Sequence, residues 1–244
     1  MAIRYEAAGA TDRGRFRPGN EDSFRLFLEP DGSLGNFVLC DGMGGAVAGE
    51  LASRIAAETM LGAMDAKIPT TETIENAGRA ANAAVLAEVA RNPGLAGMGT
   101  TLVALAARQG SGWIGHAGDS RCYLLRGRRL LQLTQDHSLV AEQLRRGEIT
   151  PEQARTSPVR NVITRAIGGE TEVVPSVRAI DIMAGDLYLL ASDGLTGEIT
   201  DEEIAEIAGR ELPLPQLCGD LIDAANRAGG RDNITCILIR TREP

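Results

Sequence analysis

The 244-residue sequence is poor in aromatic residues and has fewer basic than acidic ones. Phe, Trp and Tyr make up 3% of the chain, which leaves no aromatic platform on which nucleobases could stack. Lys and Arg number 25 against 33 Asp and Glu, and the net charge is −8. Because a nucleic-acid backbone would meet no broad basic face, we expect no nucleic-acid partner. An acidic chain that handles phosphate needs cations.

Long apolar runs and paired cysteine motifs are also absent. No stretch reaches the ~18 apolar residues of a membrane span, and the first residues, MAIRYEAAGATDRG, contain no apolar signal-peptide region. The four cysteines form no CxxC pair, which favours buried thiols in a reducing compartment over a disulfide or metal role. We therefore expect a cytoplasmic protein that does not bind membranes. The cysteines are Cys40, Cys122, Cys218 and Cys236.

The remaining composition is that of an ordinary globular domain, with 43% hydrophobic and 24% charged residues. No low-complexity linker and no internal repeat divides the chain, so we expect one domain over residues 1–244. Short aliphatic runs predict strands at 23–28, 36–40, 100–107, 112–116, 122–125, 130–133, 173–180, 187–191 and 234–239. Apolar spacing close to 3.6 predicts helices at 46–64, 72–91 and 214–228, with a further charged helical segment after His137.

The connectors between the four strands of residues 100–134 are short. They read RQGSG, AGDSR and RGR, which is too short for a helical crossover, so these strands are expected to pair antiparallel. Runs such as LYLLA and ITCILI are apolar at consecutive positions, which indicates that both faces of the strand are covered. The sequence therefore predicts an α/β layered sandwich, with two stacked antiparallel sheets flanked by helices.

Aspartates stand at the ends of four predicted strands. Asp41 follows NFVLC, Asp119 follows WIGHAG, Asp193 follows LYLLAS, and Asp232 precedes ITCILIR. Taken singly, each suits a turn residue that bonds its own backbone. Taken together, they could converge at one sheet edge, where carboxylates repel one another unless cations neutralise them. Oxygen ligands without histidine or cysteine favour Mg²⁺ or Mn²⁺ over zinc, and two such ions can activate a water held between them.

Two further segments bear on phosphate and metal binding. In RGRFRPGNEDS, a Pro-Gly-Asn turn could fold Arg17 back over Glu21 and Asp22, and an arginine fork binds phosphate in a bidentate manner. The alternative for Arg17 is a solvated surface position. DGMGGAVAGE lacks both the third glycine of a dinucleotide fingerprint and the GK[ST] ending of a P-loop. Its glycines would instead allow the backbone to approach an ion, with the Gly42 carbonyl as a candidate ligand.

These segments, in order, resemble the motifs of the metal-dependent serine/threonine protein phosphatases of the PP2C (PPM) family, bacterial type. The motifs are RFRPGNEDS, CDGMGG, GDSRCYLLR, TQDHSLV, NVITRAIG, ASDGLT and GGRDNIT, and they cover the chain from about Thr11 to Ile239. The resemblance implies an αββα sandwich. It also implies hydrolysis of phosphoserine and phosphothreonine on proteins by a hydroxide that bridges two Mn²⁺ or Mg²⁺ ions, with a third ion nearby and no covalent phosphoenzyme.

The resemblance also implies the role of each site residue. Asp41 would bridge the two core ions, and Arg17 would bind the phosphate. Asp119 would hold the third ion, shared with Asp193. The complete set of implied metal ligands is Asp41, Gly42, Asp193, Asp232, Asp119, Glu21 and Asp22, of which the last two would act directly or through waters.

One departure from the family concerns the leaving-group proton. Members often carry a histidine just after the DG or DGMGG element, where this chain has Met43 and Ala46. We expect His116 to be a core residue and His137 a structural residue that opens the flap. Our hypothesis is that a metal-bound water supplies the proton, so that alkyl phosphates react more slowly than aryl phosphates. Ala46→His should then accelerate phosphoserine turnover, since general acids contribute about 10²–10⁴-fold.

The segment at about 138–169 corresponds to the family's flap beside the active site. It is dense in charge, and Arg145, Arg146 and Arg155 are candidates for recruiting phosphopeptides, although a solvated helix with no direct role is the alternative. The implied partners are phosphorylated proteins, including a serine/threonine kinase and its substrates, and the chain is expected to be a monomer. The rival functions are a phosphatase-like binding or sensor module without turnover, or a phosphatase of one regulatory protein or a small phosphometabolite.

Overall fold

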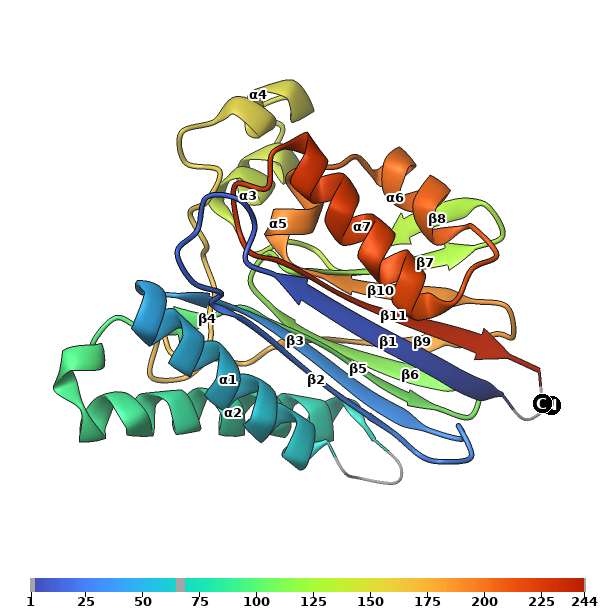
Figure 1. The fold of residues 1–244 in the computed structure, drawn as a ribbon. Coiled ribbons are helices and arrows are strands. Elements are labelled where there is room, and N and C mark those ends of the chain that lie inside the picture. Colours follow the sequence, from blue (N-terminus) through green and yellow to red (C-terminus); the bar gives the residue numbers. More distant parts are fainter. Residues whose placement is uncertain (1–2, 65–68, 244) are drawn as a thin grey trace.

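The strands form two antiparallel sheets that pack face to face (Figure 1). The computed structural model describes residues 3–64 and 69–243. The first sheet has the order β1 (Arg4–Asp12), β11 (Ile234–Arg242), β10 (Leu187–Ala191), β7 (Arg121–Arg126) and β8 (Arg129–Gln132). The second has the order β2 (Asp22–Leu28), β3 (Gly35–Met43), β5 (Leu102–Arg108), β6 (Ser111–Ala117) and β9 (Ser176–Asp181), with the short β4 (Gly99–Thr100) paired to β3.

Helices cover the outer face of each sheet, which confirms the predicted αββα sandwich (Figure 1). The second sheet is covered by α1 (Ala46–Ala63) and α2 (Thr71–Arg91), and the 3-10 turn η1 (Pro93–Leu95) follows them. The first is covered by α5 (Asp193–Thr196), α6 (Asp201–Ala208) and α7 (Leu214–Ala228). The expected flap contains α3 (Leu139–Arg145) and α4 (Pro151–Thr156). Within the described ranges, no helix has the length and apolar character needed to cross a bilayer.

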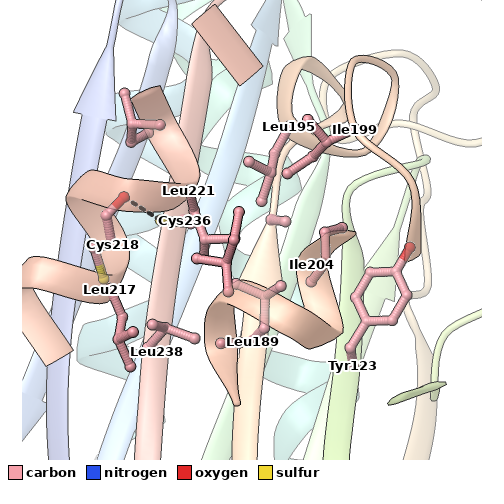
Figure 2. Close-up of a cluster of buried hydrophobic side chains, with 14 of the residues drawn as sticks. Tyr123, Leu189, Leu195, Ile199, Ile204, Leu217, Cys218, Leu221, Cys236 and Leu238 are labelled. Atoms are coloured by element: carbon pink, nitrogen blue, oxygen red, sulfur yellow. Dashed lines mark hydrogen bonds between the residues drawn. The ribbon is translucent and has the colours of Figure 1, made fainter. Parts of the chain in front are cut away.

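Aliphatic side chains fill three layers of core, as the scarcity of aromatic residues requires. One cluster lies between the sheets, and one lies under each pair of helices. Figure 2 shows the cluster under α6 and α7, where Leu217 and Leu221 of α7 meet Leu189 and Leu238 of the sheet. Each fully buried leucine contributes about 1.5–3 kcal/mol. All four cysteines are buried and free, in agreement with the sequence prediction.

The predicted pairing of strands 112–116 and 122–125 is wrong. β6 pairs with β5 and β9 in the second sheet, whereas β7 pairs with β10 and β8 in the first. The AGDSR connector therefore crosses from one sheet to the other instead of closing a hairpin. Gly118 has φ 109°, which few other residues adopt, and its position is packed against Thr101. The crossing places Asp119 between the two sheets.

Strand β1 and helix α6 were not predicted. The strand RYEAAGATD is rich in small residues and has little apolar alternation, yet it pairs with β11 along its whole length. Its strand character therefore comes from that partner, because local propensity is weak there. Helix α6 opens with a capping box in which Thr200 and Glu203 satisfy each other's backbone N–H groups. The strand expected at 173–180 lies at Ser176–Asp181, after Pro175.

Candidate metal centre

Two acids of the second sheet face each other across a strand pair. Asp41 on β3 is the register partner of Asp22 on β2, and side chains directly opposite in such a pair have Cβ atoms about 4.5–5.5 Å apart. Asp22 is 7% exposed. Two carboxylates so placed destabilise the sheet when both are ionised, unless a cation lies between them.

The first sheet brings its own acids to the same place. Asp193 begins α5, with one residue between it and the end of β10, and its charge adds to burial in raising the pKa of Asp41. The Ser192 hydroxyl donates to Asp22 Oδ2 at 2.9 Å. Asp232 lies before β11, with one residue between it and the start of the strand, and its charge acts on Asp22 and Asp41. The acids that were predicted to converge from four strand ends therefore lie close enough to influence one another's pKa.

Backbone contacts fix the Asp41 strand. The Asp41 N–H donates to the Thr101 hydroxyl at 2.9 Å, and the Asp41 carbonyl accepts from the Thr101 N–H at 2.9 Å. The next residue, Gly42, has no room for a side chain, because a Cβ there would lie 2.2 Å from the Gly49 carbonyl oxygen and 2.6 Å from that of Glu21. Glycine is thus required for close backbone approach at this point.

The electrostatics of the cluster are unfavourable without a cation. Burial first, and then repulsion from Asp22 and Asp193, raise the pKa of Asp41 well above its usual range. Burial raises the pKa of Asp22 to about 7, and repulsion from Asp193 and Asp232 adds to this effect. These carboxylates resist ionisation in the bare protein, and a bound divalent cation would reverse that preference.

Asp119 belongs to the same electrostatic group. Burial raises its pKa to about 7, and the nearest charges acting in the same direction are Asp193 and Asp136. Burial also raises the pKa of Glu21, while Arg17 opposes that shift. The Glu21 carboxylate packs on Gly49, where a Cβ would lie 1.9 Å from Glu21 Oε2.

The residues present fit a hard divalent cation. Asp22 Oδ1 is buried and has no hydrogen-bond partner among the described residues, and the charged groups that act on Asp22 are the carboxylates of Asp193 and Asp232. Within residues 3–64 and 69–243, no three such side chains are arranged around one point as a finished metal shell. Arg17 binds Asp232 Oδ2, and Ser192 binds Asp22 Oδ2, which leaves Asp22 Oδ1 open to an ion.

Arg17 folds back over the acids, as its turn predicted. Its Nη2 donates to Asp232 Oδ2 at 2.6 Å, although the two residues are far apart in the chain. That hydrogen bond raises the pKa of Arg17 above its ordinary value. Since 45% of the side chain remains exposed, the guanidinium faces both the acids and the solvent. This position suits a group that receives a phosphate above a metal centre.

A cleft of about 670 Å³ opens over these acids. Its lining includes Asp119, Asp193 and Asp232 as well as residues of α3 and α4 in the flap. Arg160 lines it, whereas Arg145 and Arg146 do not.

The expected flap arginines therefore have other surroundings. Arg146 pairs with Glu142 and Glu148 on the flap itself. The side chain of Arg155 lies outside the described part of the structure, and so does that of Ala46. The hypotheses that involve these two residues stay predictions.

Three residues that hold the acids were missed in the sequence. Ser192 binds Asp22, Thr101 binds Asp41, and the Asn233 side-chain oxygen accepts from the Glu21 N–H at 2.8 Å. Ser192 and Asn233 directly adjoin the aspartates of SDG and DN, which was the available signal. Nothing in the sequence marked Thr101.

Comparisons with known proteins agree with this arrangement. A family model described as protein phosphatase 2C matches residues 17–238. The chain belongs to the protein phosphatase 2C family, as the resemblance implied. The protein phosphatase PhpP of Streptococcus pneumoniae is 38% identical to it, over 96% of both chains.

Solved structures show the same fold. The serine/threonine phosphatase PstP of Mycobacterium tuberculosis superposes with a TM-score of 0.88 and 37% identity, covering 100% of both chains. The catalytic domain of PstP in complex with two manganese ions superposes with a TM-score of 0.86 and 36% identity, covering 99% of this chain and 100% of that one. These matches confirm the predicted fold class.

Proposed function

We propose that this chain is a metal-dependent phosphatase that hydrolyses phosphoserine and phosphothreonine on proteins. The observation that carries the proposal is the approach of Asp22, Asp41 and Asp193 from both sheets, with Arg17 bound to the neighbouring Asp232. The related PstP domain, which binds two manganese ions, supports the same cofactor for this chain.

Each residue has a role in this proposal. Asp41, Asp193 and Asp232 would hold two Mn²⁺ or Mg²⁺ ions together with the Gly42 carbonyl, and Glu21 and Asp22 would complete the site directly or through waters. Asp119 would hold a third ion with Asp193. When bound, the ions supply positive charge that lowers the pKa of water and neutralises the phosphate.

The protein's own groups orient the substrate. Arg17 would exchange Asp232 for the phosphate oxygens, because an arginine fork binds phosphate and carboxylate with the same geometry. The cleft beside the flap, with a volume of about 670 Å³, is the place where we expect a phosphorylated side chain to bind. A serine/threonine kinase and its substrates as partners, the monomeric state and the cytoplasmic location stay predictions.

The test compares the wild type with Asp193→Asn after EDTA treatment, with Mn²⁺, Mg²⁺ or Zn²⁺ then added back. We expect chelation to abolish hydrolysis of p-nitrophenyl phosphate and of a phosphothreonine peptide, Mn²⁺ to restore it, and the variant to remain nearly inert. The control is Asp220→Asn, which removes a carboxylate on α7 that pairs with Arg210 and is not one of the proposed metal ligands. Full activity in EDTA would overturn the proposal, and Mn²⁺ binding without turnover would favour a sensor module.

A further inference from the structure

A pair of histidines connects the Asp119 turn to the base of the flap. His116 lies on β6 and is 2% exposed, and His137 begins the flap segment. Their rings stack with centroids 4.5 Å apart and an interplanar angle of 23°. They are the only two histidines in the chain, and neither belongs to the proposed metal centre.

His137 holds Gly118 with two hydrogen bonds. The Gly118 N–H donates to His137 Nδ1 at 3.2 Å, and the His137 N–H donates to the Gly118 carbonyl at 2.8 Å. Thr101, whose hydroxyl binds the Asp41 N–H, packs against Gly118 from another side. The backbone that presents Asp119 is therefore fixed by its contacts with His137 and Thr101.

The same histidine joins the two ends of the flap segment. Its carbonyl accepts from the Thr164 N–H at 2.8 Å, and the adjacent Ser138 pairs with Ile163. On the ring, Nε2 lies 3.1 Å from the Ser176 hydroxyl, which also accepts from Arg165 Nη1 at 2.9 Å.

The ring's hydrogen-bonding roles follow from these contacts. Because Nδ1 accepts from Gly118, the proton of the neutral imidazole is on Nε2 and is donated to Ser176. Arg165 Nη1 lies 3.3 Å from the protonated Nε2 and donates to the Ser176 hydroxyl instead. Burial lowers the pKa of His137 to about 4, and the positive charge of Arg165 acts in the same direction. The ring is therefore neutral at pH 7, as the acceptor role of Nδ1 requires.

We propose that His137 is a positioning residue that joins the flap base to the Asp119 turn, so that its bond to Gly118 sets how tightly Asp119 holds a metal ion. This inference rests on the proposed function, since it assumes that Asp119 is a ligand. Groups that orient a metal ligand typically change metal affinity by about 10–100-fold when they are removed.

Two substitutions separate the two ends of the ring. His137→Asn keeps an acceptor near the Nδ1 position and removes the link to Ser176. His137→Gln reaches towards Ser176 and removes the acceptor for Gly118. We expect His137→Gln to weaken Mn²⁺ binding at the Asp119 site about 10–100-fold in calorimetric titration. His137→Asn should leave that affinity within about threefold of wild type.

A double-mutant cycle with Asp119→Asn distinguishes positioning from a general structural effect. If His137 acts through Asp119, His137→Gln changes Mn²⁺ binding in the wild-type background and has no further effect in Asp119→Asn. Equal losses in both backgrounds would overturn the inference, and so would an unchanged Mn²⁺ titration in His137→Gln. If His137→Gln does not fold, Ser176→Ala replaces it in the test. Ser176→Ala leaves the Gly118 bond in place, so the inference requires its Mn²⁺ affinity to stay near that of the wild type.

Failure of the proposed function would look different. If the wild type itself binds no Mn²⁺ and hydrolyses no phosphate ester, the proposed metal centre and the proposed function are both wrong. If the wild type binds Mn²⁺ and turns over substrate, and the His137 variants bind Mn²⁺ as it does, only the positioning role is wrong.

Discussion

In the absence of metal, replacing Asp22 with asparagine should stabilise the protein at alkaline pH. Asp22 is 7% exposed, one carboxylate oxygen has no partner among the described residues, and Asp41 is directly opposite. Burial raises the pKa of Asp22 from 3.8 to about 7. Asparagine has nearly the same shape, carries no charge and can still accept from the Ser192 hydroxyl.

The sign and size of the effect follow from linkage. A carboxyl group whose pKa is raised in the folded state stabilises folding below its unfolded pKa, and that stabilisation is lost as the pH rises through the folded pKa. For Asp22 the loss extends from about pH 4 to about pH 7 and amounts to at most about 4 kcal/mol at pH 8 and less than half of that at pH 5. The free energy of unfolding of metal-free Asp22→Asn should therefore exceed that of the wild type by up to these amounts.

Urea unfolding in EDTA at pH 5 and pH 8 measures this difference. Asp186→Asn is the matched control, because Asp186 is equally buried but is paired with Arg126 and accepts from the Tyr188 hydroxyl, so its loss should destabilise the protein. With saturating Mn²⁺ the order of Asp22→Asn and wild type should reverse, since a bound ion stabilises the native state. A metal-free Asp22→Asn that is no more stable than the wild type at pH 8 would refute the reasoning.

Three further predictions concern the edges of the site. Arg17→Ala should raise KM for p-nitrophenyl phosphate more than it lowers Mn²⁺ affinity in calorimetry, because the half-exposed guanidinium is bound to Asp232, which lines the cleft, and can donate hydrogen bonds to a phosphate there; an unchanged KM would contradict that role. Gly49→Ala should raise the Mn²⁺ concentration needed for half-maximal activity with little change in Tm, since the new Cβ displaces the Glu21 carboxylate. Gly42→Ala should lower Tm strongly, because its new Cβ collides with backbone atoms. Similar Tm losses for the two variants would be inconsistent with these contacts. Arg145→Glu should leave the ratio of kcat/KM for acidic and basic phosphopeptides unchanged, because Arg145 does not line the cleft, and a changed ratio would restore the recruitment hypothesis.

The layered fold could be predicted because most of its strands are short aliphatic runs that are apolar at consecutive positions. The pairing of β6 and β7 could not, because a short connector containing Gly118 can close a hairpin or change sheets, and the choice depends on packing against Thr101. Strand β1 was missed for a related reason, since its small residues acquire strand structure from pairing with β11.

The site was more predictable than the topology. Aspartates adjoin rigid strands, so Asp41 and Asp193 could be expected to meet, and the turn after Arg17 pointed back to them. The residues that support those acids are hydroxyls and amides, which are common everywhere, so Thr101 could not be distinguished in the sequence. The contacts of His137 with Gly118 and Ser176 depend on the connector that crosses between the sheets, so they could not be predicted from the sequence either.

The most direct test of the account is the anomalous scattering of a crystal grown with Mn²⁺. The account predicts at least two manganese peaks among Asp41, Asp193 and Asp232, with Arg17 released from Asp232. Peaks elsewhere on the molecule, or no peak while these three carboxylates remain as they are in the metal-free protein, would contradict it.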